Sequence, residues 1–322
     1  MEDVNRFQSF NILFMVLLGV LLGQIAIVNR YSEYLIMPSL MIMLFLVFIQ
    51  VPLRDIGASF KNLKFTVWSV SINFLWTPIL IFILGKLFLG DQPELLVGFV
   101  MLMVTPCTDW YLIFTGIAKG NVALGSSILP LNLILQLALL PLYIIFIGGA
   151  SIDINILDLG KGVILSLILP LTASIVARWG ILKKVGTYEF KEKIIPRACD
   201  FQGHFLNLAI VAMFASQGRI LVENYEVLFI LLIPVLLFFI INFFVGRVIG
   251  RVINLDYEDG VSLSLTTLAR NSPIALAIAV SSFPDKPLIS LALIIGPLIE
   301  LPVLFLVAKL LLFIRKNKVS II

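Results

Sequence analysis

The chain has 322 residues, of which 60% are hydrophobic and 13% are charged, with a formal net charge of +4 and a mean hydropathy of +1.10. A water-soluble domain carries charges on roughly a quarter of its residues, so this composition excludes one and predicts an integral membrane protein. The basic residues lie in short segments between apolar runs, which argues against a nucleic-acid partner. The two cysteines, Cys107 and Cys199, are too few for a disulfide framework or a structural zinc site.

Apolar runs long enough to cross a hydrocarbon core of about 30 Å as helix recur along the whole chain. They predict an all-α fold of about ten transmembrane helices, with residues 1–322 forming a single membrane domain. In chain order we expect these helices at Phe10 to Asn29, Tyr34 to Pro52, Phe65 to Phe88, Glu94 to Ala118, Val122 to Gly148, Gly160 to Gly180, Asp200 to Gln217, Tyr225 to Val252, Glu258 to Phe283 and Pro287 to Phe313.

The charges between the spans predict how the helices are oriented. With ten spans, both termini lie on one side of the membrane, and that side receives 16 Lys and Arg residues against 5 on the other. The larger group is Arg6, Arg54, Lys61, Lys64, Lys119, Arg178, Lys183, Lys184, Lys191, Lys193, Arg197, Arg247, Arg251, Arg315, Lys316 and Lys318; the smaller is Arg30, Lys86, Lys161, Arg219 and Lys286. Because an excess of Lys and Arg marks the cytoplasmic side, we expect a plasma or inner membrane protein with both termini in the cytoplasm. Leu182 to Arg197 is then a cytoplasmic connector.

A repeated pair of prolines divides the chain into two halves. Pro106 precedes Pro130 by 24 residues and Pro273 precedes Pro297 by the same 24, so the halves are offset by 167 residues at both positions. The two copies are residues 8–148 and 160–314. Because each copy holds five spans, an odd number, the second enters the membrane with opposite orientation. This is the inverted repeat of many secondary transporters.

Polar residues interrupt the fourth and ninth spans. The two strings are Thr105-Pro106-Cys107-Thr108-Asp109 and Arg270-Asn271-Ser272-Pro273. Because Pro ends a helix, and Thr or Ser before Pro favours the start of another, each string predicts the junction of two half-helices. Unwound backbone at membrane depth is tolerated only where protein or a wet cavity surrounds it. Two breaks at matching repeat positions therefore predict a substrate site, although a simple proline kink is the alternative at each.

Asp109 and Arg270 are charges at membrane depth, where an unpaired charge costs about 2.5–3.5 kcal/mol on insertion scales. One hypothesis is that the breaks cross near the midplane and bring these two side chains together. The alternative is that Asp109 complements the amino end of its own half-helix and Arg270 the carboxyl end of its own. Both arrangements can hold at once.

Glu300 lies far from either end of the last span, three residues after Pro297. Burial favours the protonated form of a carboxyl group, so Glu300 suits proton exchange during a transport cycle, as does Asp109. The alternative is a structural Glu that forms a hydrogen bond between helices. Asn132 lies two residues after Pro130, at the matching place in the first half, and we expect both side chains to face a cavity and Asn132 to contact the substrate.

Nothing in the sequence supports a hydrolytic or redox enzyme. It has no glycine-rich phosphate loop, no His-Glu-x-x-His metal motif and no dinucleotide fingerprint. We therefore expect no catalysis, no cofactor and no metal site, and coupling to an ion gradient, to the membrane potential or to a partner. On its chemistry alone, Cys107 is an inert small hydrophobic residue.

The two broken regions resemble the superfamily that includes the bile acid/sodium symporters and the arsenical-resistance arsenite carriers. Pro106-Cys107-Thr108, followed by Trp110 to Gly116 and Ala118-Lys119-Gly120-Asn121, is similar to the fourth span of the arsenite carriers. Leu276 to Val280 and Ile295 to Val303 are similar to that family's ninth and tenth spans.

The resemblance implies ten helices divided into a panel domain and a core domain, with crossed broken helices four and nine in the core. It also implies that Cys107 is the thiol that contacts arsenite and that Glu300 is the proton-linked carboxylate. A soft thiolate suits a trivalent arsenic species.

The chain departs from both branches of the superfamily. The arsenite carriers have an Asn-Asn-Phe-Glu string where this sequence has Ser272-Pro273-Ile274-Ala275, so that glutamate is missing. At the ninth-span cation site of the sodium symporters, Arg270 takes the place of a glutamine, and a nearby glutamate has no counterpart. A fixed cation there repels sodium and can stand in for it.

The function expected first is secondary transport, with arsenite or a related metalloid exported by coupling to protons or to the membrane potential. The alternative is a symporter for organic anions such as bile acids or small carboxylates, with sodium as a candidate coupling ion. In it, Arg270 and two half-helix amino ends hold the anion. A channel or a membrane receptor is the alternative from a different class, and paired breaks in an inverted repeat argue against a receptor. The expected partners are a small-molecule or oxyanion substrate, a coupling proton or sodium ion, and the lipid bilayer.

Overall fold

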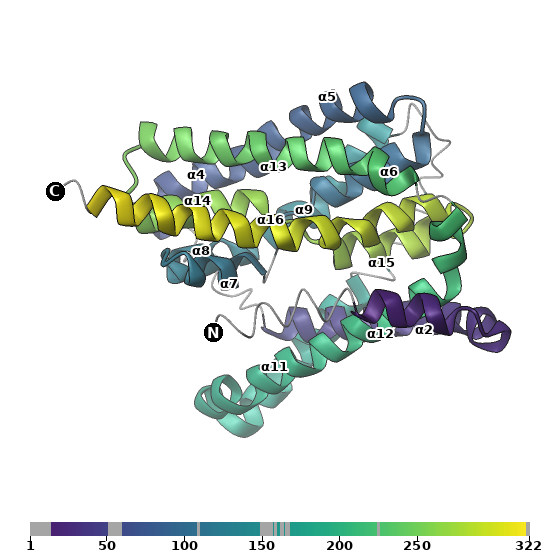
Figure 1. Cartoon of the computed structure of the whole chain (residues 1–322). Helices are drawn as coiled ribbons and strands as arrows, with labels where there is room; N and C mark the ends of the chain where they lie inside the picture. The colour runs from purple at the N-terminus through teal and green to yellow at the C-terminus, as the bar shows by residue number, and fades with distance from the viewer. Residues whose placement is uncertain are drawn as a thin grey trace.

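The structure is a computed structural model that describes residues 14–50, 60–107, 110–148, 157, 160–161, 164, 168–223 and 226–319. These residues form helices and connecting turns, with no named strand among the described elements, so the predicted all-α class is confirmed. Figure 1 shows long helices lying roughly side by side, with the carboxyl terminus at one end of the bundle.

Residues 14–22 are helical and precede α2 (Ala26–Gln50). Next come η2 (Phe60–Asn62), α4 (Leu63–Ser71), the π-helical segment η3 (Ile72–Trp76), α5 (Thr77–Leu89), α6 (Pro93–Met103), α7 (Trp110–Ile117), α8 (Val122–Ser127), α9 (Leu129–Tyr143) and the π-helical segment η4 (Ile144–Gly148). The remaining elements are α11 (Leu169–Glu189), the π-helical segment η6 (Phe190–Ile194), α12 (Ile195–Glu223), α13 (Glu226–Val252), α14 (Tyr257–Leu268), α15 (Ser272–Ser282) and α16 (Pro287–Val319).

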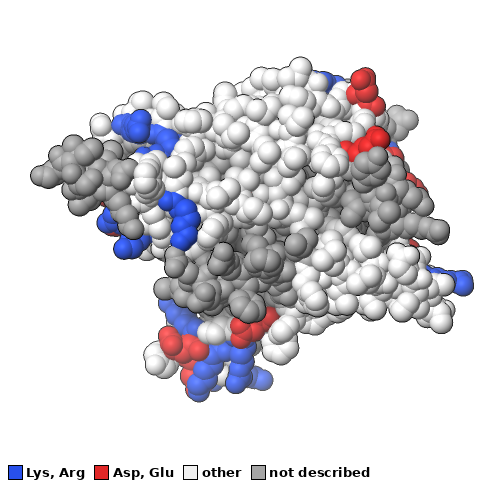
Figure 2. Space-filling view, viewed as in Figure 1, with Lys and Arg blue, Asp and Glu red and all other residues white. Residues whose placement is uncertain are grey.

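Several of these helices are long and apolar enough to cross a membrane, which makes this a multi-pass membrane protein. Among the described residues six stretches qualify: Ala26–Gln50, Leu63–Leu89, Leu129–Ile147, Leu169–Ser216, Glu226–Val252 and Pro287–Arg315. The apolar helices α6 and α15 are shorter than a full span. Figure 2 shows the charged residues toward the ends of the visible face, with a broad uncharged region between them.

The helices pack as two groups. Residues 14–22, α2, α11 and α12 form the first group, called here the panel helices, and α4 to α9 with α13 to α16 form the core helices (Figure 1). Gly19 and Gly23 allow close packing within the panel, since a Cβ at Gly19 would lie 2.7 Å from Phe214 Cβ. Contacts of α2 with α15 and of α12 with α16 join the two groups.

Helix α6 is at the centre of the core, and its residues Leu95 to Met103 are all buried. It packs against α16 through two glycines. A Cβ at Gly98 would lie 2.7 Å from Ala292 Cβ, and a Cβ at Gly296 would lie 2.6 Å from Leu102 Cδ1. The two helices therefore approach more closely than larger side chains allow, and this contact holds α16 beside the end of α6.

Several helix boundaries predicted from sequence are wrong. The gap predicted between Asn29 and Tyr34 lies inside α2. The predicted helix end at Gly180 and start at Asp200 are not observed, because α11, η6 and α12 make the connector helical, with a break at Gly186 (φ 77°, ψ 169°). Glycine adopts this positive φ without steric cost. The predicted helix from Val122 to Gly148 is divided at Ile128, because Pro130 lies in the first turn of α9.

The glycine contact between α6 and α16 predicts opposite effects for two alanine substitutions. We expect Gly98→Ala to destabilise the protein by about 1–3 kcal/mol, because its Cβ meets Ala292 and the Ile289 carbonyl at less than 3 Å. The matched control is Gly203→Ala, whose Cβ meets nothing within 4 Å and which gains up to about 1 kcal/mol of helix propensity. Thermal unfolding in detergent measures both. A Gly98→Ala protein as stable as the wild type would show that this close packing is not needed.

Candidate functional site

The first break follows α6. The helix ends at Met103, Val104 caps it, and the backbone from Thr105 to Cys107 is not helical before α7 begins at Trp110. The Thr105 hydroxyl donates to the Met101 and Leu102 carbonyls, at 3.0 and 3.1 Å, so it closes the end of α6. The predicted site residues Thr108 and Asp109 lie outside the described residues.

The second break separates α14 from α15. Helix α14 ends at Leu268, and Ala269 is already extended (φ −71°, ψ 140°). The Asn271 side chain caps α15 by accepting a hydrogen bond from the Ile274 amide at 3.3 Å, and Pro273 lies in the first turn. The Ser272 hydroxyl donates to the Leu293 carbonyl of α16.

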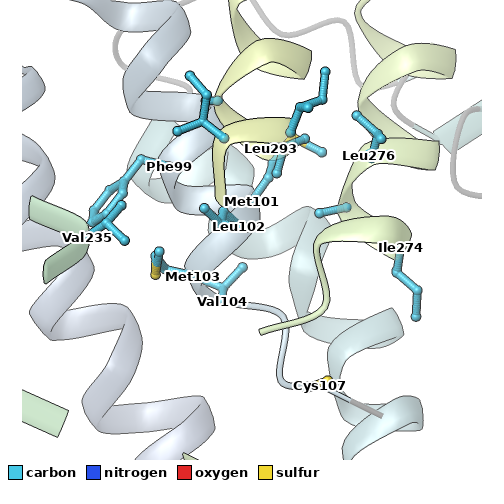
Figure 3. Close-up of a cluster of buried hydrophobic side chains, with 14 of the residues drawn as sticks. Phe99, Met101, Leu102, Met103, Val104, Cys107, Val235, Ile274, Leu276 and Leu293 are labelled. Carbon is cyan, nitrogen blue, oxygen red and sulfur yellow. The ribbon is translucent and has the colours of Figure 1, made fainter. Parts of the chain in front are cut away.

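The two breaks lie against each other as a short antiparallel bridge between Pro106 and Arg270. The Cys107 amide donates to the Ala269 carbonyl at 2.9 Å, and the Asn271 amide donates to the Thr105 carbonyl at 2.7 Å. Each unwound segment thereby satisfies backbone groups of the other, as membrane depth requires. Figure 3 shows the extended segment that leads from Val104 to Cys107 beside the start of the helix that carries Ile274.

The guanidinium of Arg270 is buried, with 1% of the residue exposed, and each of its three nitrogens donates a hydrogen bond. Nε donates to the Leu268 carbonyl at 3.0 Å, and one terminal nitrogen donates to the Met103 carbonyl at 2.9 Å. The other terminal nitrogen donates to Asn73 Oδ1 at 3.1 Å and to the Thr267 carbonyl. The guanidinium also lies 5.0 Å from the centroid of the Phe238 ring.

These carbonyls belong to the carboxyl ends of two half-helices, Met103 to α6 and Thr267 and Leu268 to α14. The carboxyl end of a helix carries a partial negative charge, so Arg270 lies where its charge is stabilised. The predicted pair between Arg270 and Asp109 stays a prediction.

Glu300 lies on α16 with 4% of the residue exposed. Its Oε1 accepts a hydrogen bond from the backbone amide of Arg270 at 2.8 Å. This amide belongs to the unwound segment, so the carboxyl group supplies an acceptor that a continuous helix would have supplied. Glu300 is thus bonded directly to the second break.

A small cavity of about 30 Å³ lies beside this bond. It is lined by Leu206, Ile210, Arg270, Ser272, Pro273, Pro297, Glu300 and Leu301. Leu206 and Ile210 come from α12, so the cavity lies between a panel helix and the core. It has room for about one or two water molecules. Cys107 is fully buried and is not one of the lining residues.

Asn132 is also fully buried, and neither polar atom of its side chain has a hydrogen-bond partner among the described residues. The same is true of Gln136, one turn further along α9. Gln136 and Asn73 are not among the site residues predicted from sequence. Both are amide side chains inside apolar spans, and that is the signal by which they could have been found.

Within the described residues, no group of three or more His, Cys, Asp and Glu side chains could hold a metal ion.

Comparison with known proteins matches residues 37–224, more than half of the chain, to the Sodium Bile acid symporter family. The chain is 26% identical over 247 residues to the arsenical-resistance protein Acr3 of Corynebacterium glutamicum, an alignment that covers 73% of this chain and 66% of that protein. It is 20% identical to Acr3 of Alkaliphilus metalliredigens over 92% of this chain and 88% of the relative. The uncharacterized transporter slr0944 of Synechocystis is 22% identical over 95% of this chain and 88% of that protein.

The family match agrees with the structure, which is an all-α, multi-pass membrane protein whose interrupted helices meet in the core. It agrees with the resemblance drawn from the residues around Pro106 and Pro273. The chain therefore belongs to the Sodium Bile acid symporter family and is a membrane transporter with arsenical-resistance proteins among its relatives.

Proposed function

We propose that this chain is a secondary active transporter that exports arsenite or a related metalloid, driven by protons or by the membrane potential. The observation that carries the proposal is the thiol of Cys107, which is buried in an unwound segment at the crossing of two half-helices. Two relatives are named arsenical-resistance proteins, which supports this substrate. A soft thiolate is a suitable ligand for trivalent arsenic.

Glu300 is the group we propose for proton coupling. Its Oε1 accepts from the Arg270 amide at 2.8 Å, and it also lines the cavity between panel and core. An ionised carboxylate accepts this hydrogen bond more strongly than a protonated one. Gain or loss of a proton at Glu300 therefore changes how firmly the second break is held. Asp109 remains the second proposed coupling residue, from its position in the sequence.

The transmembrane topology we propose is ten spans in two inverted copies. Two pairs of short helices, α6 with α7 and α14 with α15, supply two broken spans, and the stretch Leu169–Ser216 is long enough for two more. Packing supports the repeat, since α6 packs on α5 as α14 packs on α13. The offset of 167 residues also separates Met103 from Arg270, which are bonded at the crossing.

Both termini are proposed to lie in the cytoplasm. The side chains of Lys183, Lys184, Lys191 and Lys193 are exposed on the connector between the two panel spans. Figure 2 shows Lys and Arg gathered on the same side of the molecule as the carboxyl terminus in Figure 1. An excess of Lys and Arg marks the cytoplasmic side.

A second candidate cargo is an organic anion. The observation that favours it is that the first turn of α15, with Ser272 and Pro273, lines the cavity. The amino end of a helix stabilises negative charge. Arg270 contributes to the local positive potential, while its own hydrogen bonds go to protein oxygens.

Substitution of Cys107 tests the substrate. We expect everted membrane vesicles that contain the wild-type protein to accumulate arsenite, and Cys107→Ser to lose this uptake, because hydroxyl oxygen is a poor ligand for a soft metalloid. If the contact between the thiol and arsenite contributes more than about 1.4 kcal/mol, its loss weakens the apparent affinity for arsenite more than tenfold. Cys199→Ser is the matched control, since Cys199 is exposed on α12 and should leave uptake unchanged. Arsenite uptake that survives in Cys107→Ser would contradict the role of the thiol, and saturable uptake of a carboxylate in place of arsenite would favour the organic anion.

Substitution of Glu300 tests the coupling. Glu300→Gln keeps an oxygen that can accept from the Arg270 amide but has no titratable proton, so the variant should fold and transport should no longer respond to an imposed pH gradient. Uptake at several external pH values with the membrane potential clamped measures this. Glu258→Gln is the control, because Glu258 is half-exposed near Arg315 at the start of α14. A pH response equal to that of the wild type would rule Glu300 out.

A further inference from the structure

The atoms that surround the guanidinium of Arg270 form an oxygen-lined site. Four acceptors converge on it: the carbonyls of Met103, Thr267 and Leu268, and Oδ1 of Asn73. All four are neutral oxygens, and they come from three different segments of the chain. Neutral carbonyl and amide oxygens are the ligands that proteins offer to hard monovalent cations in place of water.

The position of these oxygens adds to their preference for a cation. Met103 is the last residue of α6, and Thr267 and Leu268 are the last two of α14. Helix macrodipoles direct partial negative charge to these ends. Carboxyl ends of half-helices and unwound carbonyls are the groups that coordinate coupling cations in broken-helix transporters. Without a positive charge, the four oxygens would face one another inside a buried site.

The charge that fills this site cannot leave it. Arg270 is part of the bridge between the breaks, its amide is held by Glu300, and its side chain is buried beside the Phe238 ring. A second monovalent cation at the same oxygens would lie within a few ångströms of the guanidinium, where like charges repel strongly. A free cation therefore has no room at these oxygens, and the guanidinium repels it.

From this geometry we infer that Arg270 is a built-in cation, which permanently fills an oxygen-lined site that would otherwise take a free monovalent cation, and that it makes the transporter independent of sodium. The inference about the site stands on the contacts of Arg270 alone. Only its consequence for coupling rests on the proposed function.

Thermal stability tests the site without the need for a transport substrate. Wild-type protein and Arg270→Ala, purified in detergent, are unfolded in choline chloride, in sodium chloride and in choline chloride with millimolar guanidinium. We expect the wild type to have the same Tm in all three. Arg270→Ala should lose several degrees in choline and regain them with sodium or guanidinium, because an ion that binds the folded state raises Tm.

Arg178→Ala is the matched control. Arg178 also donates to a backbone carbonyl, that of Ile49 at 2.6 Å, and also lies 5.0 Å from an aromatic ring, that of Phe190, but it is away from the breaks. We expect its loss of stability to be the same in every salt. Equal rescue of Arg178→Ala, or no cation dependence in Arg270→Ala, would overturn the inference, as would a wild type stabilised by sodium over choline.

Two further variants keep the inference testable if Arg270→Ala does not fold. Arg270→Gln is neutral, carries an oxygen of its own, and should show the same dependence on sodium or guanidinium. Arg270→Lys keeps a positive charge within reach of the same oxygens, and should fold without any cation dependence. An Arg270→Lys protein that needs added cation, or fails to fold in every salt, contradicts the role of charge.

Transport measurements then test the consequence for coupling. In proteoliposomes, replacing sodium by choline on both sides should leave wild-type arsenite flux unchanged. Sodium-dependent flux would refute the independence from sodium. Failure to find arsenite flux would count against the proposed function, while the thermal measurements would still decide the nature of the site.

Discussion

The structure depends on one constraint, which is that backbone unwound inside a membrane must find hydrogen-bond partners within the protein. Two segments are unwound here, and each is the other's partner. The amides of Cys107 and Asn271 donate across the bridge to the carbonyls of Ala269 and Thr105. Because neither break is satisfied without the other, the two interrupted helices must cross at this point. The core helices are arranged around this crossing.

The charged residues complete what the bridge leaves unsatisfied. The bridge itself provides no donors for the last carbonyls of α6 and α14, and the guanidinium of Arg270 donates to three of them. The amide of Arg270 has no helical acceptor, and Glu300 accepts from it. Both side chains thus stabilise the breaks and place ionisable groups in the buried core of the protein. Because the Glu300 carboxyl group accepts from the Arg270 amide, a change in that carboxyl group also changes how the second break is held.

The sequence allows part of this arrangement to be predicted. The composition and the apolar runs are sufficient for the all-α membrane fold. Ser272 before Pro273 marks the start of α15, but the prediction is wrong at the first break, where Thr105 closes the end of α6 and α7 begins only at Trp110. The acceptors of Arg270 could not be predicted, because three of the four are backbone carbonyls, which every residue has, and they come together only through tertiary packing. The helix between Gly180 and Asp200 was not predicted, because charged residues in a helical connector look like those of a loop.

The size of the cavity indicates which parts of the protein must move during transport. A space of about 30 Å³ holds one or two waters, which is less than an organic anion or a hydrated metalloid needs. The bridge and the contacts of Arg270 tie the breaks to α6, α14 and α16, and close packing at Gly98 ties α6 to α16. One wall of the cavity, Leu206 and Ile210, belongs instead to panel helix α12. We therefore expect admission of a substrate to separate the panel helices from the core, with the crossed breaks moving as one unit.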